Sequence, residues 1–258
     1  MKTHYKSFII ICLATVLFFP TTLLFLKMPK TFREEQMQYS RVREAYEQKE
    51  NQLIALAKEK GFPSLANDIL IVGLKKERLL QVWAKQKTQA TFVLLVEYPF
   101  CTFSGTYGPK RQEGDLQIPE GFYTLNHFNP TSNFHLSLKV SYPNASDRIL
   151  GTRGRLGGDI YIHGSCVTIG CIPITDEKIK ELYVLAVEAK SNGQSTIPIY
   201  LFPCALTDES LNTLKAETPE LQKYHTFWDN LKTGYQYFMD NKKLPKFVVD
   251  NEGKYVFE

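Results

Sequence analysis

One histidine and one cysteine, eight positions apart, are the residues of this chain best placed to do covalent chemistry. His163 ends the strand-like run DIYIH, and Cys171 follows directly after Gly170. A cysteine thiolate is a strong nucleophile, and its pKa falls beside an imidazole or near a helix N-terminus. Because a helix is predicted to begin just after Cys171, the pattern indicates a cysteine nucleophile with His163 as its general base.

Two glycines complete the predicted catalytic set. Gly170 has no side chain, so the backbone there can approach a substrate carbonyl, and the N–H of Cys171 and of a neighbour could form an oxyanion hole. Gly164, directly after the histidine, offers a backbone carbonyl that could fix the imidazole tautomer. We therefore expect Cys171, His163, Gly164 and Gly170 to form the site, without a cofactor.

The remaining cysteines leave several interpretations open. Cys166 is favoured as a structural thiol, with a disulfide partner or a catalytic helper as alternatives. Cys101 and Cys204 lie on strand-edge segments and could pair in an oxidising compartment. A zinc site is also conceivable, with the ligands His163, Cys166, Cys171 and Cys204. It is disfavoured because the sequence has no CxxC pair and the cysteine spacing is irregular, so we predict no metal.

The stretch HGSCVTIGC (163–171) resembles the active-site signature of the L,D-transpeptidase catalytic domain family, also called YkuD, and in particular its YafK-like branch. Upstream, GPKRQEGDLQIPEGFYTLN (108–126) resembles the hairpin that opens the family's substrate groove. The resemblance covers about 67–204, roughly half of the chain. Carried onto this chain, the family's nucleophile, base and orienting carbonyl are Cys171, His163 and Gly164.

This sequence departs from the common family pattern, which has a longer His-to-Cys spacing, a Ser-His-Gly-Cys ending and an Arg two residues after the Cys. Here Thr168 and Ile169 stand before Gly170, and Pro173 holds the place of the Arg. The contact that recognises a substrate carboxylate is therefore left open. With it, the choice between cross-linking and hydrolysis is left open too.

The resemblance implies an enzyme of the bacterial cell wall. Its cysteine attacks a carbonyl between an L-centre and a D-residue of a peptidoglycan stem peptide, and the acyl group passes to an amine or to water. Hydrolytic relatives stay open: an L,D-carboxypeptidase, endopeptidase or amidase that releases wall-linked peptides or proteins. A non-catalytic peptidoglycan-binding module is disfavoured, since such a module needs neither His163 nor Cys171. The expected partners are thus stem peptides and a wall-linked protein.

Short aliphatic and β-branched segments, separated by turn residues, predict the strands that position these residues. They lie at 69–74, 78–85, 91–98, 120–128, 134–142, 160–163 and 197–202. A helix is predicted from Thr175 to just before Gly193. The predicted fold class is mostly β with peripheral helices, an L,D-transpeptidase-like β-sandwich or barrel.

Four segments are expected along the chain. They are a signal-anchor or signal peptide (1–29), a helical linker (30–65), the catalytic domain (66–205) and a helical C-terminal extension (206–258) with a terminal hairpin-like stretch. The linker has one weak apolar stripe, which predicts a solvated helical stalk that packs this stripe on the next domain. As a continuous helix over 31–60 it would span up to ~45 Å.

The composition agrees with an ordinary globular protein. The 258 residues are 43% hydrophobic and 22% charged, with a formal net charge of +4. This excludes a disordered chain, and the basic surplus is too small for a dedicated nucleic-acid binder. Five cysteines are too few for a disulfide-built mini-domain.

The longest apolar run, Phe8–Leu26, predicts how the chain reaches its compartment. Its 19 uncharged residues, behind Lys2 and Lys6, are about enough to cross a bilayer core. Because no small-x-small cleavage site precedes Lys27, an uncleaved signal-anchor is favoured over a cleaved signal peptide, and both over a buried core helix. We expect the catalytic part in the periplasm or cell envelope, anchored in the cytoplasmic membrane.

Overall fold

The computed structural model describes residues 30–258. The apolar run Phe8–Leu26 lies outside the described residues, so the membrane anchor stays a prediction. Within 30–258, no helix is both long and apolar enough to cross a membrane.

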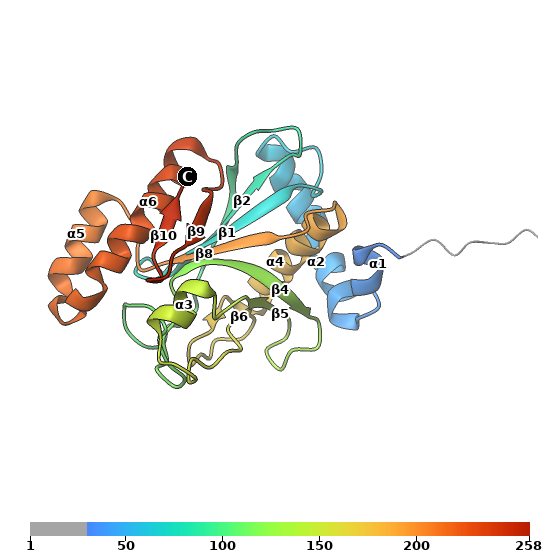
Figure 1. The fold of residues 1–258 in the computed structure, drawn as a ribbon. Coiled ribbons are helices and arrows are strands. Elements are labelled where there is room, and N and C mark those ends of the chain that lie inside the picture. The colour runs from blue at the N-terminus through green and yellow to red at the C-terminus, as the bar shows by residue number, and fades with distance from the viewer. Residues whose placement is uncertain (1–29) are drawn as a thin grey trace, which may run out of the picture.

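Eight strands form a single curled sheet, a half-barrel, in the order β3-β2-β1-β8-β4-β5-β6-β7 (Figure 1). The strands are β1 (Asp68–Leu74), β2 (Leu79–Lys85), β3 (Val93–Pro99), β4 (Gly121–Asn129), β5 (Ser137–Val140), β6 (Tyr161–His163), β7 (Ile172–Pro173) and β8 (Ile197–Phe202). Strands β1 and β8 pair in parallel, as do β6 and β7, and the other neighbours are antiparallel. Register shifts in β2 and β4 add local bends to the ordinary twist of the sheet. The predicted strands are present, and they form one curled half-barrel sheet where a β-sandwich or barrel was predicted.

The described helices are α1 (Phe32–Gln36), α2 (Ser40–Glu59), α3 (Ala145–Leu150), α4 (Thr175–Ser191), α5 (Asp208–Glu217), the 3₁₀ helix η1 (Pro219–Tyr224) and α6 (His225–Asn241). A separate hairpin, β9 (Phe247–Val249) and β10 (Tyr255–Phe257), ends the chain. It lies in the place where the sequence predicted a hairpin-like stretch.

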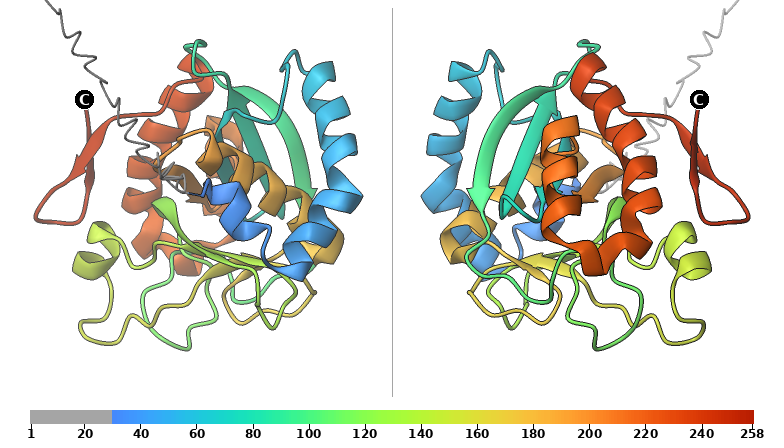
Figure 2. Two further views of the ribbon diagram at one scale, coloured as in Figure 1. Left: turned by 90° about the vertical axis from the view of Figure 1, so that its right-hand side faces the viewer. Right: turned by 90° about the vertical axis from the view of Figure 1, so that its left-hand side faces the viewer.

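Helix α4 is a core element and not a peripheral one. Most of its residues are buried, including Ile179, Leu182 and Leu185, and they join one hydrophobic cluster with the sheet. Helix α2 packs on α4 and buries Val42 and Leu53 in the same cluster (Figure 2). The prediction of peripheral helices therefore does not hold for α4.

The segment 30–65 is helical, and its apolar stripe packs on the following domain as predicted. The chain bends between α1 and α2, and both helices contact α4. The Tyr46 hydroxyl donates to Glu188 at 2.6 Å, and the Lys49 ammonium lies 2.5 Å from the Glu177 carboxylate. The apolar stripe that sequence patterning identified is thus covered by the domain itself. A continuous 45 Å spacer does not form.

The C-terminal extension covers the opposite face of the sheet. Alternation along β1 places Ile69 and Ile71 in the first cluster, while Leu70 and Val72 face a second one built with α5 and α6. Trp228 of α6 is completely buried there. The extension therefore completes the second of the two hydrophobic clusters and packs on the domain along its length.

A buried ion pair ties this extension to the loop that precedes β4. The Lys75 ammonium lies 2.8 Å from Glu120 Oε1, and the Trp228 indole N–H donates to Glu120 Oε2 at 2.8 Å. The Lys75 and Glu120 side chains are 1% and 0% exposed. Desolvation lowers the pKa of Lys75, and the facing carboxylate opposes that shift.

We expect Glu120→Gln to lower the free energy of unfolding by about 3 kcal/mol, because it leaves the Lys75 charge buried and unpaired. Trp228→Phe should cost less, about 1–2 kcal/mol, because it removes one hydrogen bond and some packing. Urea denaturation followed by far-ultraviolet circular dichroism measures both. Equal stability of Glu120→Gln and the parent protein would contradict a buried charged pair.

Candidate active site

Parallel pairing of β6 and β7 brings the predicted base and nucleophile to one sheet edge. His163 is the register partner of Pro173, so Cys171, which immediately precedes β7, lies beside the end of β6. Both residues line a cavity of about 420 Å³, and both also line an adjoining one of about 240 Å³. The structure therefore places together two residues that sequence analysis selected by type and spacing.

The imidazole of His163 is buried and fixed in one orientation. Its Nδ1 lies 2.5 Å from the carbonyl oxygen of Gly164, and its ring lies 4.6 Å from the Phe134 ring, centroid to centroid. A carbonyl can only accept, so Nδ1 carries the proton and Nε2 is left as an unprotonated nitrogen. Burial lowers the pKa of His163, which keeps the imidazole neutral near pH 7.

Position 164 has no room for a side chain, so it must be a glycine. A Cβ at this position would lie 2.5 Å from Asp176 Oδ1 and 2.7 Å from the Phe134 carbonyl oxygen. The same Asp176 oxygen accepts the Ser165 N–H at 2.7 Å and so fixes the turn after the histidine. Asp176 is not among the site residues predicted from the sequence. Its acidic character in the first turn of a helix, close after the motif, was the available signal.

The thiol of Cys171 is held in its neutral form. Burial raises its pKa, and the nearby Asp159 carboxylate adds to this, whereas the Lys110 ammonium acts in the opposite direction. The thiol donates to the Asp159 carbonyl oxygen at 3.5 Å. The expectation of a pKa lowered by a helix dipole is wrong, because α4 begins only at Thr175 and the strand β7 intervenes.

Gly170 adopts a backbone conformation that favours glycine. Its φ is +131°, and a Cβ there would lie 3.0 Å from the Gln117 carbonyl oxygen. The Thr168 hydroxyl accepts the Gly170 N–H at 3.1 Å and donates to the Cys171 carbonyl at 2.8 Å. These contacts fix the turn that presents the cysteine.

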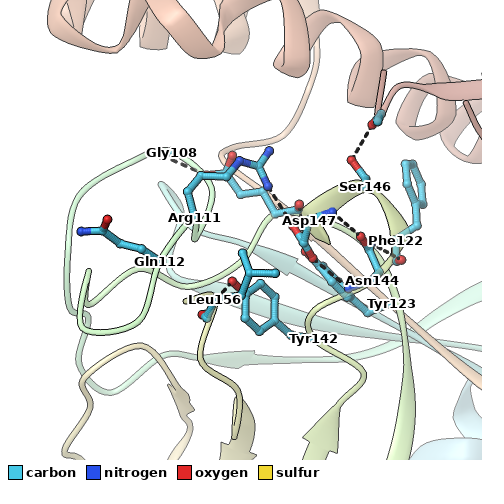
Figure 3. Close-up of polar contacts among 12 residues, drawn as sticks. Gly108, Arg111, Gln112, Phe122, Tyr123, Tyr142, Asn144, Ser146, Asp147 and Leu156 are labelled. Carbon is cyan, nitrogen blue, oxygen red and sulfur yellow. Dashed lines mark hydrogen bonds and ion pairs between the residues drawn. The ribbon is translucent and has the colours of Figure 1, made fainter. Parts of the chain in front are cut away.

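The loop that contains Arg111 and Gln117 packs beside Gly170. The buried Asp147 carboxylate anchors this loop through Arg111. Arg111 Nη1 lies 2.8 Å from Asp147 Oδ1, and the Tyr123 hydroxyl donates to Asp147 Oδ2 at 2.9 Å (Figure 3). Asp147 is the capping-box residue of α3, and its burial raises its pKa to about 6. The loop that the family resemblance identified is therefore positioned by α3.

The cysteines pair differently from every favoured expectation. Cys101 forms a disulfide with Cys166, with their Cα atoms 5.6 Å apart, and Cys204 is a buried free thiol in the second hydrophobic cluster. The Cys101–Cys204 pair, and Cys166 as a structural thiol, are therefore wrong. The Cys101 N–H donates to the Pro173 carbonyl at 3.0 Å, which holds the end of β3 beside the catalytic turn. Since Cys166 is bonded and Cys204 lies in the other cluster, the four conceivable zinc ligands do not come together.

We expect the double variant Cys101→Ser, Cys166→Ser to lose about 2–4 kcal/mol of unfolding free energy, because the bridge closes a loop of 65 residues. Its catalytic turn should also loosen, with a lower turnover. Treating the parent protein with dithiothreitol should reproduce both effects, since Cys171 stays a free thiol. Mass spectrometry that found Cys101 and Cys166 as free thiols in unreduced protein, in addition to Cys171 and Cys204, would contradict the bridge.

Comparison with known proteins identifies the family of this chain. Residues 67–199 match the family described as the L,D-transpeptidase catalytic domain, YkuD. The chain is 34% identical over 194 residues to YafK of Escherichia coli (strain K12), which carries L,D-transpeptidase as a provisional name, and the match covers 74% of each protein. Among solved structures, it is similar to the helical cell shape determining protein Pgp2 of Campylobacter jejuni, at 19% identity and a TM-score of 0.43, over 72% of this chain and 73% of that one. It is also similar to L,D-transpeptidase 1 of Mycobacterium tuberculosis, at 14% identity and a TM-score of 0.29, over 52% and 62% of the two chains.

Proposed function

Because the chain belongs to the L,D-transpeptidase catalytic domain (YkuD) family, we propose that it is an acyltransferase that forms an acyl-enzyme between Cys171 and a peptidoglycan stem peptide. The observation that carries this proposal is the pair of Cys171 and His163 on one cavity, with the His163 tautomer set by Gly164. A binding module has no use for such a pair.

The proposed reaction starts from a neutral thiol and a neutral imidazole. His163 Nε2 takes the thiol proton as Cys171 Sγ bonds to the carbonyl carbon between the L-centre and the D-residue. The Cys171 N–H stabilises the oxyanion, since the Gly170 N–H is already bonded to Thr168. The tetrahedral intermediate expels the D-residue amine, which takes the proton from His163, and a thioester remains.

The second half of the reaction repeats the first with another nucleophile. An acceptor amine gives a proton to His163 Nε2 and attacks the thioester, and the thiol leaves with that proton. Water in place of the amine yields the hydrolysed peptide by the same steps. Pro173 stands where the common family pattern has an Arg, and the product of the reaction depends on which of the two nucleophiles attacks the thioester.

The proposal is tested with purified tetrapeptide muropeptides, with and without an added amine acceptor, and mass spectrometry of the products. We expect cross-linked or exchanged peptides, together with a thioester adduct of the protein on Cys171. Cys171→Ala is the matched control and should give neither. Hydrolysed peptide alone would assign the protein to the hydrolytic relatives, and binding without any product would make it a non-catalytic module.

We further propose that the catalytic domain lies on the envelope side of the cytoplasmic membrane. Peptidoglycan is found there, and the Cys101–Cys166 disulfide suits an oxidising compartment. A β-lactamase fused after Lys60 should confer ampicillin resistance on intact cells, and deleting Phe8–Leu26 from the fusion should abolish it. A fusion that gives no resistance, while a cytoplasmic reporter at the same point is active, would contradict export.

A further inference from the structure

We propose that Lys139, at the edge of the Cys171 cavity, forms a subsite for a carboxylate of the bound peptide, with Asp159 as its resident partner when no peptide is bound. The proposal rests on the function proposed above, since it concerns the same cavity. Lys139 would supply the positive charge that the common family pattern supplies with an Arg at the position that Pro173 holds here.

Strand register places Lys139 on the face of the sheet that carries the site. Ser137 is paired with His163, and Lys139 is paired with Tyr161. Residues two apart on a strand, and residues directly opposite on antiparallel strands, share one face, so these four side chains form one group. Leu138, between the two, points to the other face and is completely buried in the core.

The Lys139 ammonium contacts two residues of the cavity wall. It lies 2.7 Å from Asp159 Oδ1 and 5.5 Å from the centre of the Tyr161 ring. Both Asp159 and Tyr161 line the cavity with Cys171, and the Asp159 carbonyl accepts from the thiol. The Lys139 ammonium and the Cys171 thiol therefore both contact Asp159, the ammonium at its carboxylate and the thiol at its backbone carbonyl.

The described residues that line this cavity include no Lys or Arg, and its histidine, His163, is neutral. Lys139 reaches the cavity wall through its contacts with Asp159 and Tyr161. Lys110 acts on Cys171 electrostatically, but its side chain is only 6% exposed and is bonded to Asp115 and to a backbone carbonyl. Lys139 is therefore the ammonium that an incoming carboxylate can reach.

The present partner of Lys139 is easily exchanged. The Asp159 side chain is 80% exposed, and that of Lys139 is 28% exposed, whereas in the buried Lys75–Glu120 pair both are nearly completely covered. A solvent-exposed ion pair contributes little net stability, so a ligand carboxylate can take the place of Asp159 at low cost. In the peptide-free protein, the Asp159 carboxylate occupies the position that a ligand carboxylate would take.

The test measures binding, so that it does not depend on turnover. The background is Cys171→Ala, and the probes are a stem tetrapeptide and the same peptide with every carboxylate converted to a carboxamide, each titrated by calorimetry. Adding Lys139→Met should weaken binding of the acid peptide about tenfold and leave the amide peptide unchanged. Lys139→Arg should retain the preference for the acid. Asp159→Asn, which suits the φ of +58° at that position, should strengthen binding of the acid.

Lys215→Met is the matched control, because Lys215 forms a comparable exposed pair with Asp229 on the C-terminal extension and should change neither titration. Circular dichroism establishes that each variant is folded. The proposal is overturned if acid and amide peptides bind the background protein equally, if neither binds, or if Lys139→Met weakens both alike. It stands if the acid preference depends on Lys139, even where the unsubstituted enzyme turns over no stem peptide, an outcome that would count against the proposed function alone.

Discussion

Cys171→Ala should reduce turnover of a stem peptide by about 10⁴-fold or more, the largest effect that we expect from any single substitution. Removing the nucleophile leaves only binding and oxyanion stabilisation, which cannot form a thioester. The variant should remain folded, since the loss of one sulfur atom at the cavity wall disturbs little packing. Steady-state assays with muropeptides measure the loss, and circular dichroism checks the fold.

Covalent labelling assigns the nucleophile independently of the natural substrate. A carbapenem-type acylating reagent should add once to the unsubstituted protein, and peptide mapping should find the adduct on Cys171. Cys166 is held in a disulfide, and burial raises the pKa of Cys204 to about 12, so neither should react. Cys204→Ala is therefore the matched control and should label fully. An adduct on Cys166, or on Cys204, would remove Cys171 from the proposed role.

Local sequence patterns predicted the strands and the catalytic pair because these features depend on neighbouring residues. The run DIYIH at 159–163 alternates as a strand should, and Gly164 and Gly170 bracket the turn that connects the histidine to the cysteine. Patterns of this kind predict that an element exists and which residue types stand at its end.

The strand order, the packing of the N-terminal helices and the disulfide depend on contacts between residues far apart in the chain, which local sequence patterns do not predict. The strand order joins β1 to β8 in parallel across more than a hundred residues, and no local pattern encodes that choice between one curled sheet and a sandwich. The apolar stripe of 31–60 was visible, but its partner α4 lies far along the chain. The disulfide partner of Cys166 could not be predicted for the same reason, because Cys101 is separated from it by 65 positions in the chain.

The direction of the pKa shift of the Cys171 thiol also depends on the folded structure and was not predicted correctly from the sequence. Proximity to a helix in sequence suggested stabilisation of a thiolate, but the two residues of β7 lie between Cys171 and α4, and burial decides the direction of the shift. A raised pKa of Cys171 and a lowered pKa of His163 both favour the neutral pair. Catalysis then requires a proton transfer when the peptide binds, so loss of the base should slow turnover strongly.

His163→Ala should therefore lower turnover by about 10²–10⁴-fold, because the Cys171 thiol loses its proton acceptor. His127→Ala, at an exposed position of β4, is the control and should leave turnover unchanged. Labelling by the acylating reagent should slow in parallel in the His163 variant. Unchanged turnover in a folded His163→Ala protein would exclude His163 as the base.

The pH dependence of turnover separates a base from a merely structural histidine. A general base acts only when unprotonated, so activity should fall as pH drops through the pKa of His163. Because burial lowers that pKa below its ordinary value of 6.5, the fall should begin at a more acidic pH than for an exposed histidine. The residual activity of His163→Ala should lack this acidic limb and rise with pH as the Cys171 thiol ionises without help. A structural histidine would instead leave the shape of the profile unchanged while lowering its height.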